Sequence, residues 1–470
     1  MKTEQTPKRT LNRRKFLQLS STAAGLALLS ACAAPAAQPS ESAAPGQEQI
    51  LLRYSHWGNE DEKASTWSTL QAFMEQNPNI TVEQMYIPEA GDPYLQKMNA
   101  MAASNTLPDG ALFPDAHTLN WGLRDMFLDL SEIYTGEHEK VDAIQYRTPD
   151  GRIVGVSGAQ EIQLIWYNKD LFDEEGIPYP PASAEEAWSW DQSLEFAKQL
   201  TVDVNGNNAL SAAFDPTSLD RFGFQIGLSD MPVITYMRSN GGDIFNEDWT
   251  GLTLDAPQSV EAIQMMADLM NVHSVMPKLT AGGTMSTDSG LLSRKIAMAM
   301  DGQWVLETLN RVRREEGLNF GIGVLPYIQD KVTTATGGPI IAFSASQHPA
   351  EAMQLVSFIM DPANTPDYIT GGLWMPNEKR WYHEPELLSI WIDNENHPPE
   401  YKSAVVDYSL DYVTRPLPIY RLPNWPGMWQ ILNPALEQVW LGEKTAEEAI
   451  AGVMPQASAY FDAEIAPLMI

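Results

Sequence analysis

The stretch Val154-Gly-Val-Ser-Gly-Ala-Gln-Glu-Ile-Gln-Leu-Ile-Trp-Tyr-Asn-Lys-Asp-Leu-Phe172 follows a Pro-Asp-Gly turn and contains two apolar runs. Such a turn favours a strand after it, and the first run, 153–156, is short and β-branched. The second run, 162–167, is apolar enough for a strand that is buried on both faces. Gln160 and Glu161 lie between the runs, although buried polar groups need partners. We therefore predict two strands joined by a polar bend, as in a hinged crossing between two lobes.

A chain of 470 residues is too long for one hydrophobic core, so two lobes are expected. Its first part alternates between strand-like and helix-like patterns, which predicts an α/β fold with a parallel sheet covered by helices. Ligands of such sheets bind beyond the carboxyl ends of the strands, here at loops 56–59 and 114–117. The expected strands are 50–55, 80–87 and 107–113, and the expected helices are 64–76 and 94–104.

The rest of the chain continues this alternation after the crossing. Amphipathic spacing predicts helices at 188–200, 259–271 and 349–360, and apolar runs predict strands at 222–226, 295–300, 320–325 and 339–343. Residues 236–245 contain Asn-Gly-Gly and are expected to form a loop, and residues 301–304 are expected to form a loop that opens a helix.

The N-terminus has the features of an export signal. Residues 8–15 are rich in lysine and arginine, and residues 17–30 form an apolar run too short to span a bilayer. Residues 12–17 (Asn-Arg-Arg-Lys-Phe-Leu) resemble a twin-arginine export signal, and residues 29–32 (Leu-Ser-Ala-Cys) resemble the lipobox of bacterial lipoproteins. We expect residues 1–31 to be removed as a signal peptide.

Cys32 is the only cysteine of the chain, so it cannot form an internal disulfide. A cysteine directly after small residues behind an apolar segment is typical of lipidation; the alternative is an incidental cysteine in a discarded peptide. Residues 32–49 are rich in Ala, Pro, Ser and Gln and predict a flexible tether. No later stretch reaches about 18 apolar residues, so lipid on Cys32 would hold the protein at the outer face of the cell membrane.

The charge of the chain argues against a nucleic-acid partner. The whole sequence has a net charge of −31, and residues 1–31 carry six basic residues and one acidic residue. The part after the signal peptide therefore has a net charge of −36. Such a surface is repelled by nucleic acid and by anionic lipid headgroups, and it suits a protein outside the cytoplasm.

The chain contains, in this order, the segments WYNKDLF (166–172), NGGDIF (240–245), KIAMAMDGQW (295–304) and GGPIIA (337–342). Together they resemble the sugar-binding, maltose-binding-protein-like family of extracellular solute-binding proteins of ABC importers. The resemblance covers nearly all of the chain after the signal peptide. One segment departs from the pattern: Arg294-Lys295 stands where Gly-Lys is usual, and Gln303 stands in place of proline.

The resemblance implies a periplasmic-binding-protein-like fold of type II, with two α/β lobes, hinge crossings and a ligand cleft between the lobes. It implies a first lobe of residues 50–157 plus 339–372, and a second lobe of residues 158–338 plus 373–470 with the tail helices. It also implies a monomeric receptor, not an enzyme, that carries a sugar or oligosaccharide to permease subunits. By position, Glu161 and Trp304 match a sugar-binding glutamate and a stacking aromatic residue of the family.

The residues themselves suggest which side chains would hold a sugar. Carboxylates and amides bind paired hydroxyl groups, and flat aromatic rings cover the C–H face of a sugar ring. For Trp374 and Trp425 ordinary core packing is an equal alternative, Asp115 could simply be solvated, and Asn59 could only cap the first helix. The candidates are Trp57, Trp304, Trp374 and Trp425 as platforms, Asn59, Asp115, Gln160 and Glu161 as polar partners, and Gly337 and Gly338 where the chain returns.

Other functions have less support from the sequence. A carboxylate pair such as Glu161 with Asp115 could serve a glycan hydrolase, but no spacing requires it. The chain has no HExxH, GxSxG or Walker A motif, its histidines are scattered, and the polar segment 203–207 is expected to be a turn rather than a calcium loop. We expect no cofactor and no metal. A non-sugar solute such as a polyamine or a phosphodiester remains an alternative, although many tryptophans with few basic residues argue against phosphate.

Overall fold

The structure is a computed structural model that describes residues 48–88, 91–133, 136–279 and 285–469. The proposed signal peptide, Cys32 and most of the proposed tether lie outside the described residues. Within the described ranges, no helix is both long enough and apolar enough to cross a membrane.

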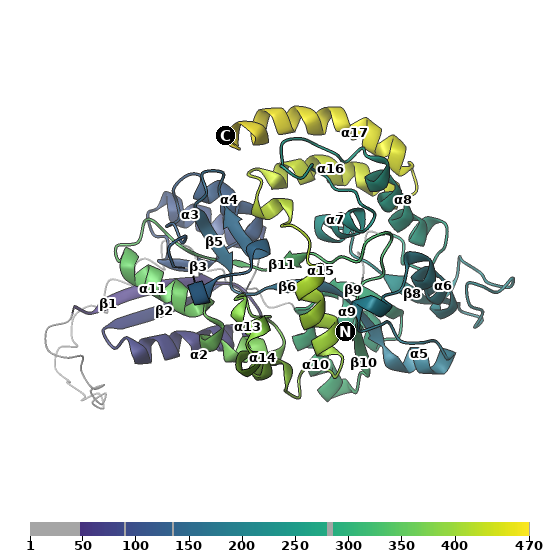
Figure 1. Ribbon diagram of the computed structural model, residues 1–470, viewed down its shortest axis with the longest axis horizontal. Coiled ribbons are helices and arrows are strands. Elements are labelled where there is room, and N and C mark those ends of the chain that lie inside the picture. Colours follow the sequence, from purple (N-terminus) through teal and green to yellow (C-terminus); the bar gives the residue numbers. More distant parts are fainter. Residues whose placement is uncertain (1–47, 89–90, 134–135, 280–284, 470) are drawn as a thin grey trace, which may run out of the picture. The chain divides into compact units, whose positions relative to one another are not determined.

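The first sheet has the order β2-β1-β3-β12-β5-β4, and Figure 1 labels β1, β2, β3 and β5 of it. Strands β1, β2 and β3 are mutually parallel, as the sequence predicts, whereas β12 runs antiparallel to β3 and β5. The strands are β1 (Ile50–His56), β2 (Ile80–Tyr86), β3 (Gly110–Leu112), β4 (Gln145–Arg147), β5 (Ile153–Ser157) and β12 (Pro339–Ala342). Its helices are α2 (Glu60–Gln76), α3 (Asp92–Ala103), α4 (Asp115–Gly122) and α11 (Pro349–Met360).

The second sheet has the order β10-β6-β9-β8-β7, with β11 paired to the start of β6. Its strands are β6 (Glu161–Asn168), β7 (Val202–Asp203), β8 (Leu219–Gln225), β9 (Ile296–Gly302), β10 (Phe320–Gly323) and β11 (Ala335–Thr336). Its helices are α5 (Lys169–Glu175), α6 (Trp190–Leu200), α7 (Asp230–Ser239), α8 (Pro257–Asn271), α9 (Thr287–Leu292) and α10 (Val305–Glu316). Two mixed α/β sheets confirm the predicted fold of two α/β lobes.

The stretch 154–172 forms β5, a bend, β6 and the first turn of α5. All residues of both strands are buried, which confirms the prediction from their apolar runs. The expectation of a loop at 236–245 is wrong in its first part, because α7 extends to Ser239. The loop begins only at Asn240, where Gly241 takes a positive φ of 76° that favours glycine.

Three chain segments run side by side between the two sheets. Thr336 pairs with Glu161 across β11 and β6, and the Gln160 amide donates to the Met375 carbonyl over 3.0 Å. A Cβ atom on Gly337 would lie 2.1 Å from Ser157 Oγ, so glycine allows two of these segments to approach closely. The bend after β5 therefore belongs to a bundle of crossing segments.

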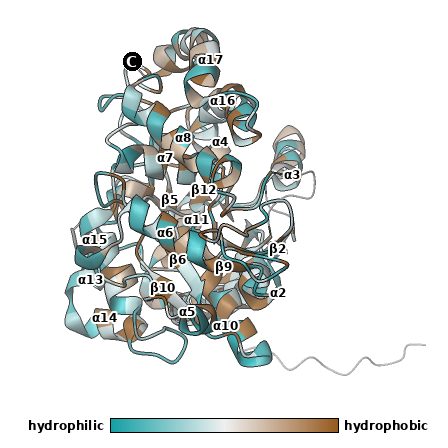
Figure 2. Ribbon diagram, turned by 90° about the vertical axis from the view of Figure 1, so that its right-hand side faces the viewer, coloured by the Kyte–Doolittle hydropathy of each residue, from teal (hydrophilic) through white to brown (hydrophobic). Residues whose placement is uncertain are grey.

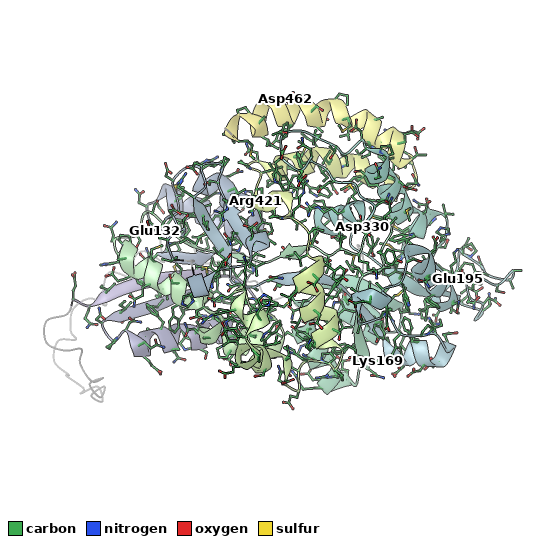
Figure 3. The ribbon with its side chains drawn as sticks, in the orientation of Figure 1. Glu132, Lys169, Glu195, Asp330, Arg421 and Asp462 are labelled. Carbon is green, nitrogen blue, oxygen red and sulfur yellow. The ribbon has the colours of Figure 1, made fainter. Side chains whose placement is uncertain are left out.

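The C-terminal part of the chain forms further helices, and the segment between them contacts residues of both lobes. Arg415 pairs with Asp243, which follows α7. Arg421, which is labelled in Figure 3, donates from Nη1 to the Gln145 carbonyl of β4 over 2.5 Å. The residue boundaries given above for the two lobes remain a prediction. The helices are α12 (Pro366–Gly371), α13 (Arg380–His383), α14 (Pro385–Ile392), α15 (Tyr408–Tyr412), α16 (Trp425–Trp440) and α17 (Ala446–Tyr460).

The buried side chains of β5 belong to two different hydrophobic clusters, one on each face of the first sheet. Val154 joins the cluster that includes Phe113 and Trp121, and Val156 joins the cluster that includes Leu70 and Leu355. The outer helices carry both hydrophilic and hydrophobic residues, as α17 shows in Figure 2. The two faces of the sheet are thus covered by different helices.

Candidate ligand-binding site

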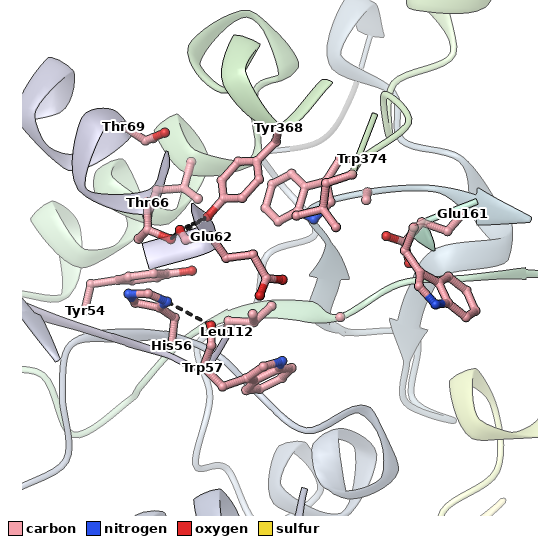
Figure 4. Close-up of a pocket in the computed structure, with 15 residues that line it drawn as sticks. Tyr54, His56, Trp57, Glu62, Thr66, Thr69, Leu112, Glu161, Tyr368 and Trp374 are labelled. Atoms are coloured by element: carbon pink, nitrogen blue, oxygen red, sulfur yellow. Dashed lines mark hydrogen bonds between the residues drawn. The ribbon is translucent and has the colours of Figure 1, made fainter. Parts of the chain in front are cut away.

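A cavity of about 220 Å³ lies where the end of β1 meets the crossing segments (Figure 4). Residues from both lobes line it. They are Tyr54, His56, Trp57, Glu62, Thr66, Thr69, Leu112, Ala159, Glu161, Trp304, Gly338, Ile359, Tyr368, Leu373 and Trp374. Five of the ten residues chosen from the sequence are among them: Trp57, Glu161, Trp304, Gly338 and Trp374.

Trp57 comes directly after β1 and is held by an edge-on contact. Its ring centroid lies 5.1 Å from that of Tyr94 at an interplanar angle of 79°. A Cβ atom on Gly338 would lie 3.6 Å from Trp57 Cζ2, so the ring also contacts the returning segment. The loop at the carboxyl end of β1 therefore presents an aromatic ring at the cavity, as expected for this kind of sheet.

Trp374 stacks on Tyr368 with ring centroids 4.1 Å apart and an interplanar angle of 14°. The Tyr368 hydroxyl also donates to the Glu62 carbonyl over 2.9 Å. A Cβ atom on Gly158 would lie 2.8 Å from Trp374 Cη2, so only glycine leaves room for the ring above the bend. The indole is therefore fixed over the first crossing segment.

Trp304 is the residue before α10, as the sequence predicts, but the loop expected at 301–304 is shorter, because β9 extends to Gly302. The Trp304 ring lies over its own turn. A Cβ atom on Gly302 would lie 1.9 Å from Trp304 Cζ3. The glycine at the end of β9 thus makes room for an indole that folds back toward the cavity.

Glu161 is the first residue of β6, and its side chain is only 9% exposed. No hydrogen-bond donor among the described residues reaches its carboxyl group. Burial raises the pKa of Glu161 to about 8, and the charge of Glu62 adds to this shift. The group therefore holds its proton near neutral pH and can both donate and accept a hydrogen bond.

Glu62 lies in the first turn of α2 and reaches the same space from the other lobe. Figure 4 shows the carboxyl groups of Glu62 and Glu161 pointing into the space beside Trp374 from opposite sides. Glu62 also completes a capping box: its Oε2 accepts from the Asn59 amide, and its own amide donates to Asn59 Oδ1 over 2.9 Å.

His56 lines the cavity as a neutral group. Its Nδ1 lies 2.9 Å from the Trp57 carbonyl, and its Nε2 lies 2.9 Å from the Gln84 amide nitrogen. A carbonyl only accepts and an amide nitrogen only donates, so Nδ1 carries the proton and Nε2 accepts. Burial lowers the pKa of His56, which favours this neutral tautomer.

The other five chosen residues lie outside the lining of this cavity. Asn59 caps α2, as the alternative in the sequence analysis allowed. Gly337 serves the close approach of two crossing segments. Gln160 is buried, and its Oε1 has no hydrogen-bond partner among the described residues. Trp425 is 2% exposed, so its ring offers no open face; it begins α16 instead of lying in a loop.

Asp115, the fifth of these, begins α4 near a carboxylate that the sequence analysis did not select. Burial raises the pKa of Asp115 to about 6; a hydrogen bond from the Ala116 amide opposes the shift, and Asp230 adds to it. Asp230 begins α7 and accepts from Trp425 Nε1 over 2.8 Å. The two carboxylates thus come from helices of different lobes, close enough for one charge to affect the other.

The described part of the chain holds no group of three or more His, Cys, Asp or Glu side chains that could bind a metal ion. In the polar segment 203–207, Asp203 Oδ1 accepts from the amides of Asn205 and Asn207, which makes it a turn. The side chains at the cavity instead suit a ligand with both polar groups and apolar faces.

Residues 57–366 match the family model of the bacterial extracellular solute-binding proteins. The chain belongs to this family. The match begins at Trp57, in the loop after β1, and ends at Pro366, the first residue of α12, so it covers the strands of both sheets except β1, and the first two crossing segments. The match includes ten of the fifteen residues that line the cavity of this solute-binding protein. The other five lie just outside it: Tyr54, His56, Tyr368, Leu373 and Trp374.

Relatives and solved structures agree with this membership. The solute-binding protein is 21% identical over 403 residues to a binding protein of Brucella abortus, with 83% of this chain and 88% of the relative covered. It is 22% identical over 380 residues to the sn-glycerol-3-phosphate-binding periplasmic protein of Rhizobium meliloti, with coverage of 79% and 81%. The crystal structure of the cyclic alpha-maltosyl-1,6-maltose binding protein from Arthrobacter globiformis superimposes with a TM-score of 0.69 at 18% identity, covering 87% of this chain and 98% of that one.

Proposed function

We propose that this solute-binding protein is the receptor of an ABC importer and that it binds a sugar or oligosaccharide in the cavity beside Trp57, Trp304 and Trp374. The observation that carries the proposal is the combination of three indole rings with the carboxyl groups of Glu62 and Glu161 around one space. Rings cover the C–H faces of a sugar, and carboxyl groups bind its hydroxyls. The sugar named for the Arthrobacter globiformis structure supports this ligand class.

Delivery depends on a change in the arrangement of the lobes. The cavity takes its residues from both lobes, so a bound sugar contacts both and favours the closed arrangement. The permease would recognise this closed form. The bend at 157–161 would then act as a hinge, because it joins β5 of the first lobe to β6 of the second lobe. It would also form the floor of the cleft, because Ala159 and Glu161 line the cavity.

The protein would be anchored through lipid on Cys32 after removal of residues 1–31. It would act as a monomer at the outer face of the cell membrane, with residues 32–49 as a tether. Globomycin treatment and metabolic labelling with palmitate test the anchor. Cys32→Ser should abolish the label and release the protein from the membrane fraction; a labelled variant would contradict the assignment.

A non-sugar anion such as a glycerol phosphate fits the cavity less well. Among the described residues that line it there is no lysine or arginine, and phosphate recognition relies on such cations. The ligand named for the Rhizobium meliloti relative is therefore not transferred to this chain.

Thermal-shift screening against neutral and aminated mono- and oligosaccharides tests the sugar assignment. A ligand that binds only the folded state raises the melting temperature by mass action. Trp304→Ala should weaken the shift while the melting of the free protein stays nearly unchanged. A panel without any shift would contradict the sugar assignment, and release of product from a glycan would contradict the role of a receptor.

A further inference from the structure

Three polar side chains outside the lining of the cavity form a buried cluster. Lys140, in the segment before β4, is 1% exposed, and Asn377 and Glu378, in the crossing segment 375–378, are fully buried. The Lys140 ammonium donates to Glu378 Oε1 over 2.8 Å, to Asn377 Oδ1 over 3.0 Å and to the Met360 carbonyl over 2.8 Å. The cluster thus ties this crossing segment to the first lobe.

Asn377 connects the cluster to the bend between β5 and β6. Its Nδ2 donates to the Ser157 carbonyl over 2.8 Å. Two residues earlier, the Met375 carbonyl accepts from the Gln160 amide over 3.0 Å. The crossing segment 375–378 therefore holds the bend near both of its ends.

Lys140 determines which way the amide of Asn377 points. An ammonium group only donates hydrogen bonds, so the amide oxygen faces Lys140 and the amide nitrogen faces the Ser157 carbonyl. A buried ion pair such as Lys140 with Glu378 adds little net stability, because both charges lose their hydration. The best-attested role of such a pair is to select one arrangement of the chain.

The bend held in this way carries part of the cavity floor. Ala159 and Glu161 line the cavity, and Figure 4 shows Glu161 and Trp374 beside the same space. A Cβ atom on Gly158 would lie 2.8 Å from Trp374 Cη2, so the bend also supports this ring. A shift of the bend therefore moves the Glu161 carboxyl group and the surface under the indole together.

We infer that Lys140 and Asn377 are positioning residues of the ligand site, which hold the bend that carries Glu161 in place without lining the cavity themselves. This inference rests on the proposed function and deepens it, because it concerns the same cavity. Asn377→Asp tests it. The new carboxylate keeps the shape of the side chain and the contact with Lys140, but it cannot donate to the Ser157 carbonyl.

The matched control is Asn168→Asp, at the opposite end of β6. Asn168 is 3% exposed, and its Nδ2 donates to the Leu291 carbonyl over 3.0 Å within the second lobe. Its Oδ1 caps α5, a role that aspartate keeps. Both variants lose one hydrogen bond from a buried asparagine to a carbonyl, and only Asn377→Asp should affect the bend.

Hydrogen exchange of the ligand-free protein, read by mass spectrometry on peptides, reports on the bend directly. In Asn377→Asp the amides of Ala159 and Gln160 should exchange roughly tenfold faster, the change expected for one lost hydrogen bond. Peptides within β6 should keep their rates, and Asn168→Asp should leave the bend unchanged. Lys140→Met, a second variant that lets the Asn377 amide turn, should accelerate the same two amides.

A pH profile separates positioning from a general loss of stability. Burial first, and the charge of Glu62 second, raises the pKa of Glu161 to about 8, so the unaltered protein loses stability from pH 5 to pH 9. In Asn377→Asp the bend loosens and Glu161 gains solvent, so this loss should be smaller in urea unfolding. The new carboxylate stays ionised beside Lys140 over this range and adds no slope. Asn168→Asp should keep the full loss.

Titration calorimetry with maltotriose as the probe completes the test. Asn377→Asp should weaken binding roughly tenfold, and Asn168→Asp should leave it unchanged. Unchanged exchange at the bend, an unchanged pH profile or an unchanged affinity in Asn377→Asp would overturn the inference, and the proposed function would stand. If neither maltotriose nor any sugar of the thermal-shift panel binds the unaltered protein, the proposed function is wrong. Exchange and the pH profile, which need no ligand, then still decide whether the two residues position the cavity floor.

Discussion

Glu161 couples the stability of the empty receptor to pH. Its pKa is raised from 4.5 to about 8 in the folded state, by burial first and by Glu62 second. The folded protein therefore holds a proton that the unfolded chain releases, and stability is fully present below pH 4.5 and is lost as pH rises through about 8. Tyr54 and Tyr368, which also line the cavity, keep one state over this range, because burial raises the pKa of both hydroxyls further above it.

The change Glu161→Gln should remove this dependence. We expect the variant to gain stability relative to the unaltered protein as pH rises from 5 to 9, since the amide cannot ionise. Urea unfolding at pH 5, 7 and 9 measures the effect. An equal difference between the two proteins at pH 5 and pH 9 would contradict the role of Glu161. Asp115 provides an internal comparison, because burial raises its pKa to about 6 in both proteins. Its own contribution to the pH dependence of stability is therefore the same in both and cancels in the difference between them.

Gly302 and Trp304 form a coupled pair. In Gly302→Ala the new Cβ would fall within the indole of Trp304, so the ring must move away from the cavity. Overpacking of this kind destabilises by about 1–3 kcal/mol, and sugar binding should weaken as well. In the double variant with Trp304→Ala the clash is absent, and stability should return to within about 0.5 kcal/mol of Trp304→Ala alone. Additive losses in this double-mutant cycle, measured by urea unfolding, would show that the ring does not lie over Gly302.

At the scale of elements, the crossing strands could be predicted from the sequence and α7 could not. Continuous buried runs identify β5 and β6 because strands buried on both faces are apolar along their whole length. The Asn-Gly-Gly after Ser239 favours a loop, and the expected loop was extended too far back, over the last turn of α7. Ser229 at the cap position and Pro232 in the first turn are signals of a helix start that the prediction did not use.

The cavity was predictable only in part, for a physical reason. Trp57, Glu161 and Trp304 stand next to strand ends, where the fold places ligands. Glu62 and Tyr368 did not stand out, because a capping residue and a helical tyrosine are explained by local structure. Their place at the cavity depends on contacts between segments about 300 positions apart, such as that between Tyr368 and the Glu62 carbonyl, and no local pattern encodes such contacts.

The crossing segments should be intolerant of added atoms. In Gly337→Ala the new Cβ would lie 2.5 Å from the Ala159 carbonyl oxygen, which belongs to backbone and cannot turn away. We expect a loss of about 1–3 kcal/mol in urea unfolding. The matched control is Gly452→Ala in α17, where nothing lies within 4 Å and alanine should stabilise the helix by about 0.5–1 kcal/mol. Equal effects of the two changes would contradict a tight crossing.

At the scale of the whole described chain, the C-terminal part links the two lobes outside the crossing segments. Arg415 is tied to Asp243 in the second lobe by Nη2 over 2.9 Å. A few residues later, Arg421 is tied to the first lobe through the Gln145 carbonyl and through Asp142 Oδ2 over 2.9 Å. The link holds the lobes in the described arrangement, so it should contribute to the balance between open and closed forms.

Cutting this link at Arg421 should shift that balance. Arg421→Ala removes hydrogen bonds that involve a charged group, each of which contributes about 1.5–3 kcal/mol. We expect a larger radius of gyration in small-angle X-ray scattering of the free protein, weaker sugar binding, and recovery of the compact profile at saturating sugar. Arg294→Ala, which breaks an exposed pair with Glu174 within the second lobe, should leave both the scattering and the affinity unchanged. If Arg421→Ala scatters and binds as the unaltered protein does, the Arg421 contact does not contribute to the free-energy difference between the open and closed forms. The three crossing segments alone would then set the arrangement of the lobes.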